Sequence, residues 1–231
     1  KTNTYYYTSN EGSPLRSAVY KIDAKGRKTK LSAKEGTNRA IFSKSMKYYI
    51  NTFTNITTPP VITINDNTGK TLTTLVDNKR LAEKVANLHM PSKEFFTFTT
   101  SDGVELNGWM MKPANFDANK KYPVIMHQYS GPGSQRVIDQ WNIGSRSDGG
   151  MFEAYMADHG FISVCVDGRG TGGRGAEFEK CTYMNLGVKE ARDQVETALY
   201  LGTLPYVDAK NIGIWGWSFG GYTTLMAMSE G

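Results

Sequence analysis

Cysteine, histidine and long apolar runs are scarce in this sequence. Its 231 residues contain two cysteines, Cys165 and Cys181, which excludes a disulfide-rich scaffold and a zinc site built from four cysteines. No apolar stretch approaches the roughly 18 residues that a membrane helix needs, so no transmembrane segment is expected in this chain. The N-terminus also lacks the apolar segment and cleavage site of a signal peptide. Either a signal has been removed or this N-terminus lies inside a longer protein.

Basic residues are unevenly distributed along an otherwise ordinary composition. Hydrophobic residues make up 39% of the chain and charged residues 21%, which is typical of a folded protein and excludes disorder. Residues 1–91 carry a net charge of +9 and residues 92–231 one of −4, which indicates two units with different surfaces. The lysines of the first part are scattered and do not form a stripe, so we expect a solvated β surface and no nucleic-acid binding.

The first ninety residues contain an internal repeat. The tyrosine-rich run at 5–10 recurs at 48–52, and the alternating run at 19–23 recurs at 61–65, an offset of 42. A period of about 40–45 residues with several short strands is typical of a β-propeller blade. Because a propeller needs roughly four to eight blades to close, we expect residues 1–91 to be its last two blades plus a connecting helix, without the earlier blades. A small two-sheet β domain is the alternative.

The second part, residues 92–231, reads as strands alternating with helices. Apolar and β-branched runs predict an antiparallel hairpin followed by buried strands, and amphipathic periodicity predicts the helices between them. The expected strands are 94–99, 104–111, 122–129, 161–166 and 211–215, and the expected helices are 151–159, 188–201 and 222–229. This alternation predicts a mainly parallel sheet covered on both faces.

Between the last strand and the last helix, residues 216–220 fit the pattern G-x-S-x-G. Gly216, Trp217, Ser218, Phe219 and Gly220 would form a nucleophile elbow, a sharp strand-to-helix turn that exposes Ser218 as a nucleophile. The two glycines let the turn close, and the helix N-terminus places unpaired N–H groups beside the developing oxyanion. A glycine-rich turn with a capping serine is the alternative.

An oxyanion hole would need two donors. The backbone N–H of Phe219 is one, and the second should come from the loop after the strand that ends at Tyr129, either a tyrosine hydroxyl or a backbone N–H. Tyr129 could equally be a packing residue. The glycine-rich run at 167–175 contains a literal G-x-G-x-x-G, but no apolar helix directly follows it and no acidic residue stands at the required spacing. We interpret it as a loop that shapes the floor of the site.

None of the three histidines in the sequence fits the position of a catalytic base. In the strand–elbow–helix fold the order along the chain is Ser, then Asp or Glu, then His, yet His89, His127 and His159 all precede Ser218 and read as packed or solvated histidines. Thirteen residues follow Ser218, and they include one acid and no histidine. We therefore expect the triad Asp and His to lie outside this chain. The 231-residue chain alone should be inactive and poorly soluble, with an exposed strand edge at 211–215.

Three segments together resemble the dipeptidyl peptidase IV branch of the prolyl oligopeptidase family. Residues 216–222, Gly-Trp-Ser-Phe-Gly-Gly-Tyr, resemble its signature Gly-Trp-Ser-Tyr-Gly-Gly-Tyr. Residues 129–135 resemble its Tyr-Ala-Gly-Pro-x-Ser-Gln loop, and residues 167–172 its Asp-Gly-Arg-Gly-Ser-Gly loop. The resemblance implies β-propeller blades followed by an α/β-hydrolase domain, both incomplete in this chain, with residues 92–231 as the N-terminal half of the hydrolase domain.

The resemblance also implies an activity. Members are serine exopeptidases that release dipeptides from free N-termini, preferably after Pro or Ala, through an acyl-enzyme and without a metal or organic cofactor. By resemblance Ser218 is the nucleophile, Tyr129 the oxyanion-hole hydroxyl, and Phe219 a backbone donor whose ring lines the proline pocket. Phe219 departs from the usual Tyr, a change that should matter little because the backbone donor stays. The glutamates that bind the substrate amine would lie in earlier blades.

Two rival functions stay open at this point. One is a prolyl tripeptidyl peptidase of the same branch, and the other is a non-catalytic homologue whose propeller binds partners. The intact elbow argues against the second. The branch is mostly periplasmic, secreted or membrane-anchored, so an extracytoplasmic location is expected, and a homodimer is compatible with the resemblance.

Overall fold

The computed structural model describes residues 3–91, 93–142 and 150–230. The chain divides into two compact units, one formed by Lys1–Leu88 with Ile138–Trp141 and the other by His89–Val137 with Asn142–Gly231. The sequence placed the boundary between residues 91 and 92, and Ser92 lies outside the described residues. It gave no sign that a short segment near residue 140 belongs to the first unit.

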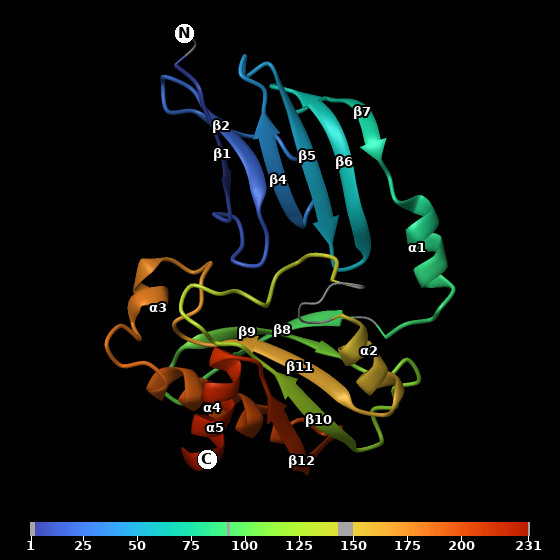
Figure 1. The fold of residues 1–231 in the computed structure, drawn as a ribbon, viewed down its shortest axis with the longest axis vertical. Helices are drawn as coiled ribbons and strands as arrows, with labels where there is room; N and C mark the ends of the chain where they lie inside the picture. Colours follow the sequence, from blue (N-terminus) through green and yellow to red (C-terminus); the bar gives the residue numbers. More distant parts are fainter. Residues whose placement is uncertain (1–2, 92, 143–149, 231) are drawn as a thin grey trace. The chain divides into compact units, whose positions relative to one another are not determined.

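The first unit consists of two antiparallel sheets (Figure 1). The strands of the three-stranded sheet are β1 (Tyr5–Ser9), β2 (Ala18–Ile22) and β3 (Lys28–Lys30). Those of the four-stranded sheet are β4 (Thr37–Phe42), β5 (Tyr48–Asn55), β6 (Thr58–Asp66) and β7 (Thr71–Val76). The short helix α1 (Lys79–Ala86) follows. Val19, Leu31 and Tyr49 are buried together in a small apolar core between the sheets.

The repeat seen in the sequence corresponds to equivalent hairpins. β1 and β2 pair antiparallel, as do β5 and β6. In both repeats an aspartate closes the next turn: the carboxylate of Asp23 accepts hydrogen bonds from the N–H groups two and four residues later, and that of Asp66 does the same. Gly26 and Gly69 complete these turns with φ values of 78° and 96°, which glycine adopts without strain. β4 has no equivalent in the first sheet and was not foreseen.

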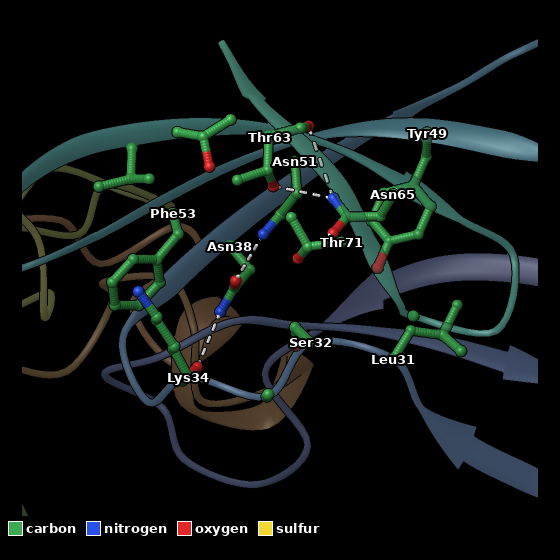
Figure 2. Close-up of a pocket in the computed structure, with 14 residues that line it drawn as sticks. Leu31, Ser32, Lys34, Asn38, Tyr49, Asn51, Phe53, Thr63, Asn65 and Thr71 are labelled. Atoms are coloured by element: carbon green, nitrogen blue, oxygen red, sulfur yellow. Dashed lines mark hydrogen bonds between the residues drawn. The ribbon is translucent and has the colours of Figure 1, made fainter. Parts of the chain in front are cut away.

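Three buried asparagines line one cavity of the first unit. Asn38, Asn51 and Asn65 line it together with threonines and Lys34, as Figure 2 shows. Its volume is about 210 Å³. Asn38 donates from Nδ2 to the carbonyl oxygens of Ser17 and Lys34 at 3.0 and 3.2 Å, and its Oδ1 accepts from Asn51 Nδ2 at 3.0 Å. Asn38 therefore ties β4 to β5 and to the chain directly before β2 and after β3.

Replacing Asn38 by Ala should destabilise the first unit by about 2–3 kcal/mol. The substitution removes the partner of the buried Asn51 Nδ2 and the side-chain donor to Lys34 O, and such groups keep their desolvation penalty. Ser17 O loses one of its two donors and keeps the backbone N–H of residue 38. Urea unfolding monitored by fluorescence measures the change. Asn115, which is exposed in a loop of the second unit, provides the matched control, since Asn115→Ala should shift the free energy of unfolding by less than about 0.5 kcal/mol. Equal effects of the two substitutions would contradict the role given to Asn38.

The second unit is built on one mixed sheet with the strand order β12-β10-β11-β9-β8 (Figure 1). Its strands are β8 (Lys93–Thr99), β9 (Glu105–Met111), β10 (Tyr122–His127), β11 (Ile162–Asp167) and β12 (Val207–Trp215). β10 runs parallel to both β11 and β12, whereas β9 is antiparallel to β11 and β8. The expectation of a mainly parallel sheet was therefore wrong for half of the pairings, because the predicted hairpin joins the sheet through β9.

Helices cover this sheet and leave one strand edge open. The helices are α2 (Met151–Asp158), α3 (Ala176–Lys180), α4 (Val188–Gly202) and α5 (Phe219–Glu230). α2 packs against β11 and β9, while α4 and α5 pack against β12 and each other. Within the described residues no strand pairs with the outer edge of β12, as predicted for 211–215.

In the part of the chain that the structure describes, no helix is both long enough and apolar enough to cross a bilayer.

Candidate active site

The turn between β12 and α5 has the geometry of a nucleophile elbow. β12 ends at Trp215 and α5 begins at Phe219. Ser218 between them has a φ of 58°, in the left-handed region that non-glycine residues rarely occupy because it strains the backbone. Its side chain is exposed, and its carbonyl oxygen accepts the N–H of Tyr222 at 3.1 Å. The strained serine turn predicted from the sequence is present.

Both glycines of the elbow are required by the strand beside it. A Cβ atom on Gly216 or on Gly220 would lie 2.5 Å from the backbone oxygen of Gln128. That carbonyl group follows β10, the neighbour of β12 in the sheet. The elbow therefore packs directly on the chain that leads into the next loop, and side chains at these two positions would force them apart.

Tyr129 opens that loop and lies beside the elbow. Its ring centroid is 6.3 Å from that of Phe219, and the Arg136 guanidinium lies 4.9 Å from the ring centroid of Tyr129 on its face. Ser130, the next residue, has a φ of 58°, so the backbone bends sharply immediately after the tyrosine. Phe219 is the first residue of α5, and N–H groups in the first turn of a helix have no intrahelical partner. The structure thus brings both predicted oxyanion donors to the same end of the sheet.

Trp217, also predicted as part of the elbow, is 82% exposed. Phe219 makes an edge-to-face contact with Tyr222, their ring centroids 5.4 Å apart. The rings of Tyr129, Phe219 and Tyr222 form an aromatic surface next to Ser218.

The glycine-rich loop after β11 is hydrogen-bonded to the loop that follows Tyr129. Asp167 accepts the N–H groups of Arg136 and Val137 at 2.9 and 2.7 Å. The loops also bond backbone to backbone, since Gly133 N donates to Gly170 O and Gly172 N donates to Ser134 O. Residues 167–175 therefore hold the loop that follows Tyr129, and their interpretation as a floor of the site stays a prediction.

A buried ion pair fixes this floor to α4. Arg169 donates to the carboxylate of Asp193 from Nε at 3.1 Å and from Nη2 at 2.5 Å, and from Nη1 to Asp102 at 2.8 Å. The Asp193 side chain is fully buried, and the two carboxylates raise the pKa of the Arg169 guanidinium. Gln194, the next residue on α4, donates to Ser130 Oγ at 3.3 Å and to Val166 O at 3.2 Å. No motif in the sequence signalled these contacts, because they join residues far apart in the chain.

With this geometry the chain can be compared with known proteins. Residues 1–60 match the family described as Dipeptidyl peptidase IV (DPP IV) N-terminal region, and residues 151–231 match the Prolyl oligopeptidase family. A crystal structure of dipeptidyl peptidase 4 from Porphyromonas gingivalis matches with a TM-score of 0.94 and 52% identity, over 100% of this chain and 32% of that one. Along its whole length the chain is similar to the dipeptidyl peptidase IV branch of the prolyl oligopeptidase family.

Curated relatives agree with this assignment. A protein of Sclerotinia sclerotiorum named "Probable dipeptidyl-aminopeptidase B" is 37% identical over 236 residues, which is 100% of this chain and 25% of that protein. The chain thus spans about a quarter of the length of the curated relatives it matches. The fold expected for the branch, propeller strands followed by an α/β-hydrolase sheet, is confirmed.

The described part of the chain does not supply the base of a triad. His127 is buried, lies 2.9 Å from Glu153 Oε1 through Nδ1 and stacks on Trp215, so it is a packed histidine as predicted. His159 is exposed directly after α2, and its Nδ1 lies 2.8 Å from Tyr155 O. No histidine among the described residues hydrogen-bonds to Ser218. Nor does that part of the chain contain a group of three or more His, Cys, Asp or Glu placed to hold a metal ion.

The ion pairs beneath the site make the stability of the second unit sensitive to acid. Hydrogen bonds from Thr100 and Arg169 lower the pKa of Asp102 from 3.8 to about 2. A carboxyl whose pKa is depressed by folding stabilises the fold above its unfolded pKa, and this contribution disappears as the pH falls from about 4 towards 2.

We therefore expect Asp102→Asn to lower the urea midpoint at pH 6 and to make the midpoint fall less steeply between pH 4 and pH 2. The Asp102 side chain is 32% exposed, so solvent screening keeps the change moderate. Other carboxylates titrate equally in both proteins, and the difference between the two curves isolates Asp102. Parallel curves would contradict the prediction.

Proposed function

We propose that the full-length gene product is a serine exopeptidase that releases dipeptides from free N-termini and prefers Pro or Ala at the second position. The observation that carries this proposal is the strained, exposed Ser218 at a strand–helix elbow packed on the chain that leads into Tyr129. Relatives named dipeptidyl peptidase or dipeptidyl-aminopeptidase support the choice of reaction.

The chemistry follows from the position of each group. Ser218 Oγ attacks the carbonyl carbon of the scissile bond, and its proton passes to a histidine outside the described residues. The negative charge that develops on the carbonyl oxygen is stabilised by the Phe219 N–H, the N-terminus of α5 and the Tyr129 hydroxyl. Expulsion of the amine, which takes the proton from the histidine, leaves an acyl-enzyme on Ser218. Water then hydrolyses this ester and restores the serine.

The aromatic surface formed by Tyr129, Phe219 and Tyr222 fits a compact apolar side chain. A proline ring packs well on such faces. Phe219 therefore contributes the pocket wall through its ring and the oxyanion donor through its backbone. No metal or organic cofactor takes part in this scheme. An extracytoplasmic location and a homodimer are further parts of the proposal that rest on the family alone.

Peptide substrates of two lengths test the proposal in the full-length gene product. Chromogenic amides of Xaa-Pro and Xaa-Xaa-Pro with free N-termini are compared with the N-acetylated Xaa-Pro amide, and a fluorophosphonate probe reports the nucleophile. We expect cleavage of the free Xaa-Pro amide and labelling of Ser218. Preference for the longer amide would indicate a tripeptidyl peptidase, and absence of both labelling and cleavage would indicate a binding protein. The 231-residue chain alone should do neither, because its described part supplies no base.

A further inference from the structure

We propose that Gln128 is a positioning residue that holds the Tyr129 loop at a fixed distance from the Ser218 elbow. The inference rests on the proposed function, because it assigns to Tyr129 and Ser218 the roles given there. Gln128 stands immediately after β10 and immediately before Tyr129, and only 1% of its surface is exposed. It was not singled out by any sequence motif.

Every polar group of Gln128 but one contacts β12, the elbow or α5. Its backbone N–H donates to O of Trp215, the last residue of β12, at 3.2 Å. Its carbonyl oxygen fills the space left open by the absent side chains of Gly216 and Gly220. Its Nε2 donates to Gly220 O at 2.6 Å and to Thr224 Oγ1 at 3.0 Å, both on α5.

These contacts span the two halves of the oxyanion hole. Gly220 follows Phe219 directly and lies two residues from Ser218, while Gln128 is bonded covalently to Tyr129. The Nε2 bonds therefore join the element that carries the nucleophile and one donor to the residue that precedes the other donor. Catalytic groups must be held close to their productive positions, and a displacement of about 1 Å can lower the rate about 100-fold.

The remaining polar atom, Oε1, allows a positioning role of Gln128 to be tested separately from a purely structural one. Oε1 of Gln128 is buried and has no hydrogen-bond partner among the described residues, and such an atom destabilises a fold. Methionine has a similar length and no such atom. Its substitution removes the penalty of the unpaired Oε1 as well as the two Nε2 bonds to α5, so the two effects on stability offset each other.

Gln128→Met in the full-length gene product tests this directly. We expect kcat for the free Xaa-Pro amide to fall about 10-fold or more, with KM within about two-fold and an unchanged or raised melting temperature. Thr224→Val removes one of the two acceptors, so it should lower kcat by a smaller factor. Because both substitutions remove the same bond, the double variant should be no slower than Gln128→Met alone.

Asn65→Leu is the matched control. Asn65 is also a buried amide, but it lies in the first unit and both ends are bonded, Nδ2 to Thr63 and Oδ1 to Thr71. It should therefore lower the melting temperature and leave kcat unchanged, which is the reverse of the Gln128→Met pattern. The two substitutions together distinguish loss of geometry at the site from loss of stability.

Three results would overturn the role of Gln128. One is an active wild type with equal kcat in Gln128→Met, and the proposed function would survive it. The second is a Gln128→Met protein whose melting temperature falls as much as that of Asn65→Leu. The third is a wild type that is neither labelled nor active, which would overturn the proposed function and this inference together.

Discussion

Ser218→Ala should lower kcat of the full-length gene product by a factor on the order of 10⁶, the scale seen when the nucleophile of a serine protease is removed. The alanine side chain cannot form the acyl-enzyme, so hydrolysis by this route stops. The backbone donor at Phe219 and the hydroxyl of Tyr129 stay in place, since neither depends on Ser218 Oγ. Substrate affinity should therefore be retained, and binding of a Xaa-Pro peptide to the inactive variant measures it.

Ser229→Ala is the matched control for this substitution. Ser229 lies near the end of α5, the helix that follows Ser218. It is exposed and donates from Oγ to Met226 O at 2.9 Å. Its replacement should leave turnover and fluorophosphonate labelling unchanged. A Ser218→Ala protein with normal turnover would remove Ser218 as the nucleophile, and labelling that persists in it would show that the probe reacts elsewhere.

The elbow could be predicted from sequence because its requirements are local. A strand, two glycines at fixed spacing around a serine and a helix are all contained in about twenty residues, and the backbone strain at Ser218 follows from that arrangement. The hairpin turns at Asp23 and Asp66 are local in the same way. An aspartate and a glycine three residues later specify each turn without help from the rest of the fold.

The supports of the site could not be predicted in this way. The bonds from Gln128 to Gly220, from Arg169 to Asp193 and from Asp167 to the Tyr129 loop connect residues 24 to 92 positions apart. Their existence depends on the sheet order, which brings the ends of β10, β11 and β12 together. A buried glutamine or arginine carries no periodic signal of its own, so each appeared in the sequence as an ordinary polar residue.

The same limit explains the segment 138–141. Asp139 is buried in the first unit, where its carboxylate accepts from Arg16 Nε at 2.8 Å and from Ile56 N at 3.0 Å. A lone aspartate in a loop gives no indication of which unit will bind it. β4 was not predicted for a related reason. The described three-stranded sheet contains no strand that corresponds to β4, so comparing the two repeats could not reveal it.

Tyr129→Phe should lower kcat by about 100-fold or more, the scale of losing one oxyanion-hole donor. The substitution removes only the hydroxyl, so the ring contacts with Phe219 and Arg136 should hold the loop in place. The Phe219 N–H would still stabilise the oxyanion, which is why the loss should be far smaller than for Ser218→Ala. KM should change little, because the hydroxyl acts on charge that is absent from the bound substrate.

A boronic acid inhibitor of the Xaa-Pro type gives the decisive measurement, because its tetrahedral adduct with Ser218 carries the charge of the intermediate. Its affinity should fall in parallel with kcat in Tyr129→Phe, whereas the affinity for a product dipeptide should not. Tyr206→Phe is the control, since Tyr206 makes only a weak contact from its hydroxyl to Met110 Sδ at 3.8 Å. If Tyr129→Phe keeps both its rate and its boronate affinity, the second donor must be a backbone N–H of the loop that follows Tyr129. In that case the tyrosine ring serves the pocket alone, and the anchoring of the loop by Gln128 and Asp167 becomes the main determinant of the rate.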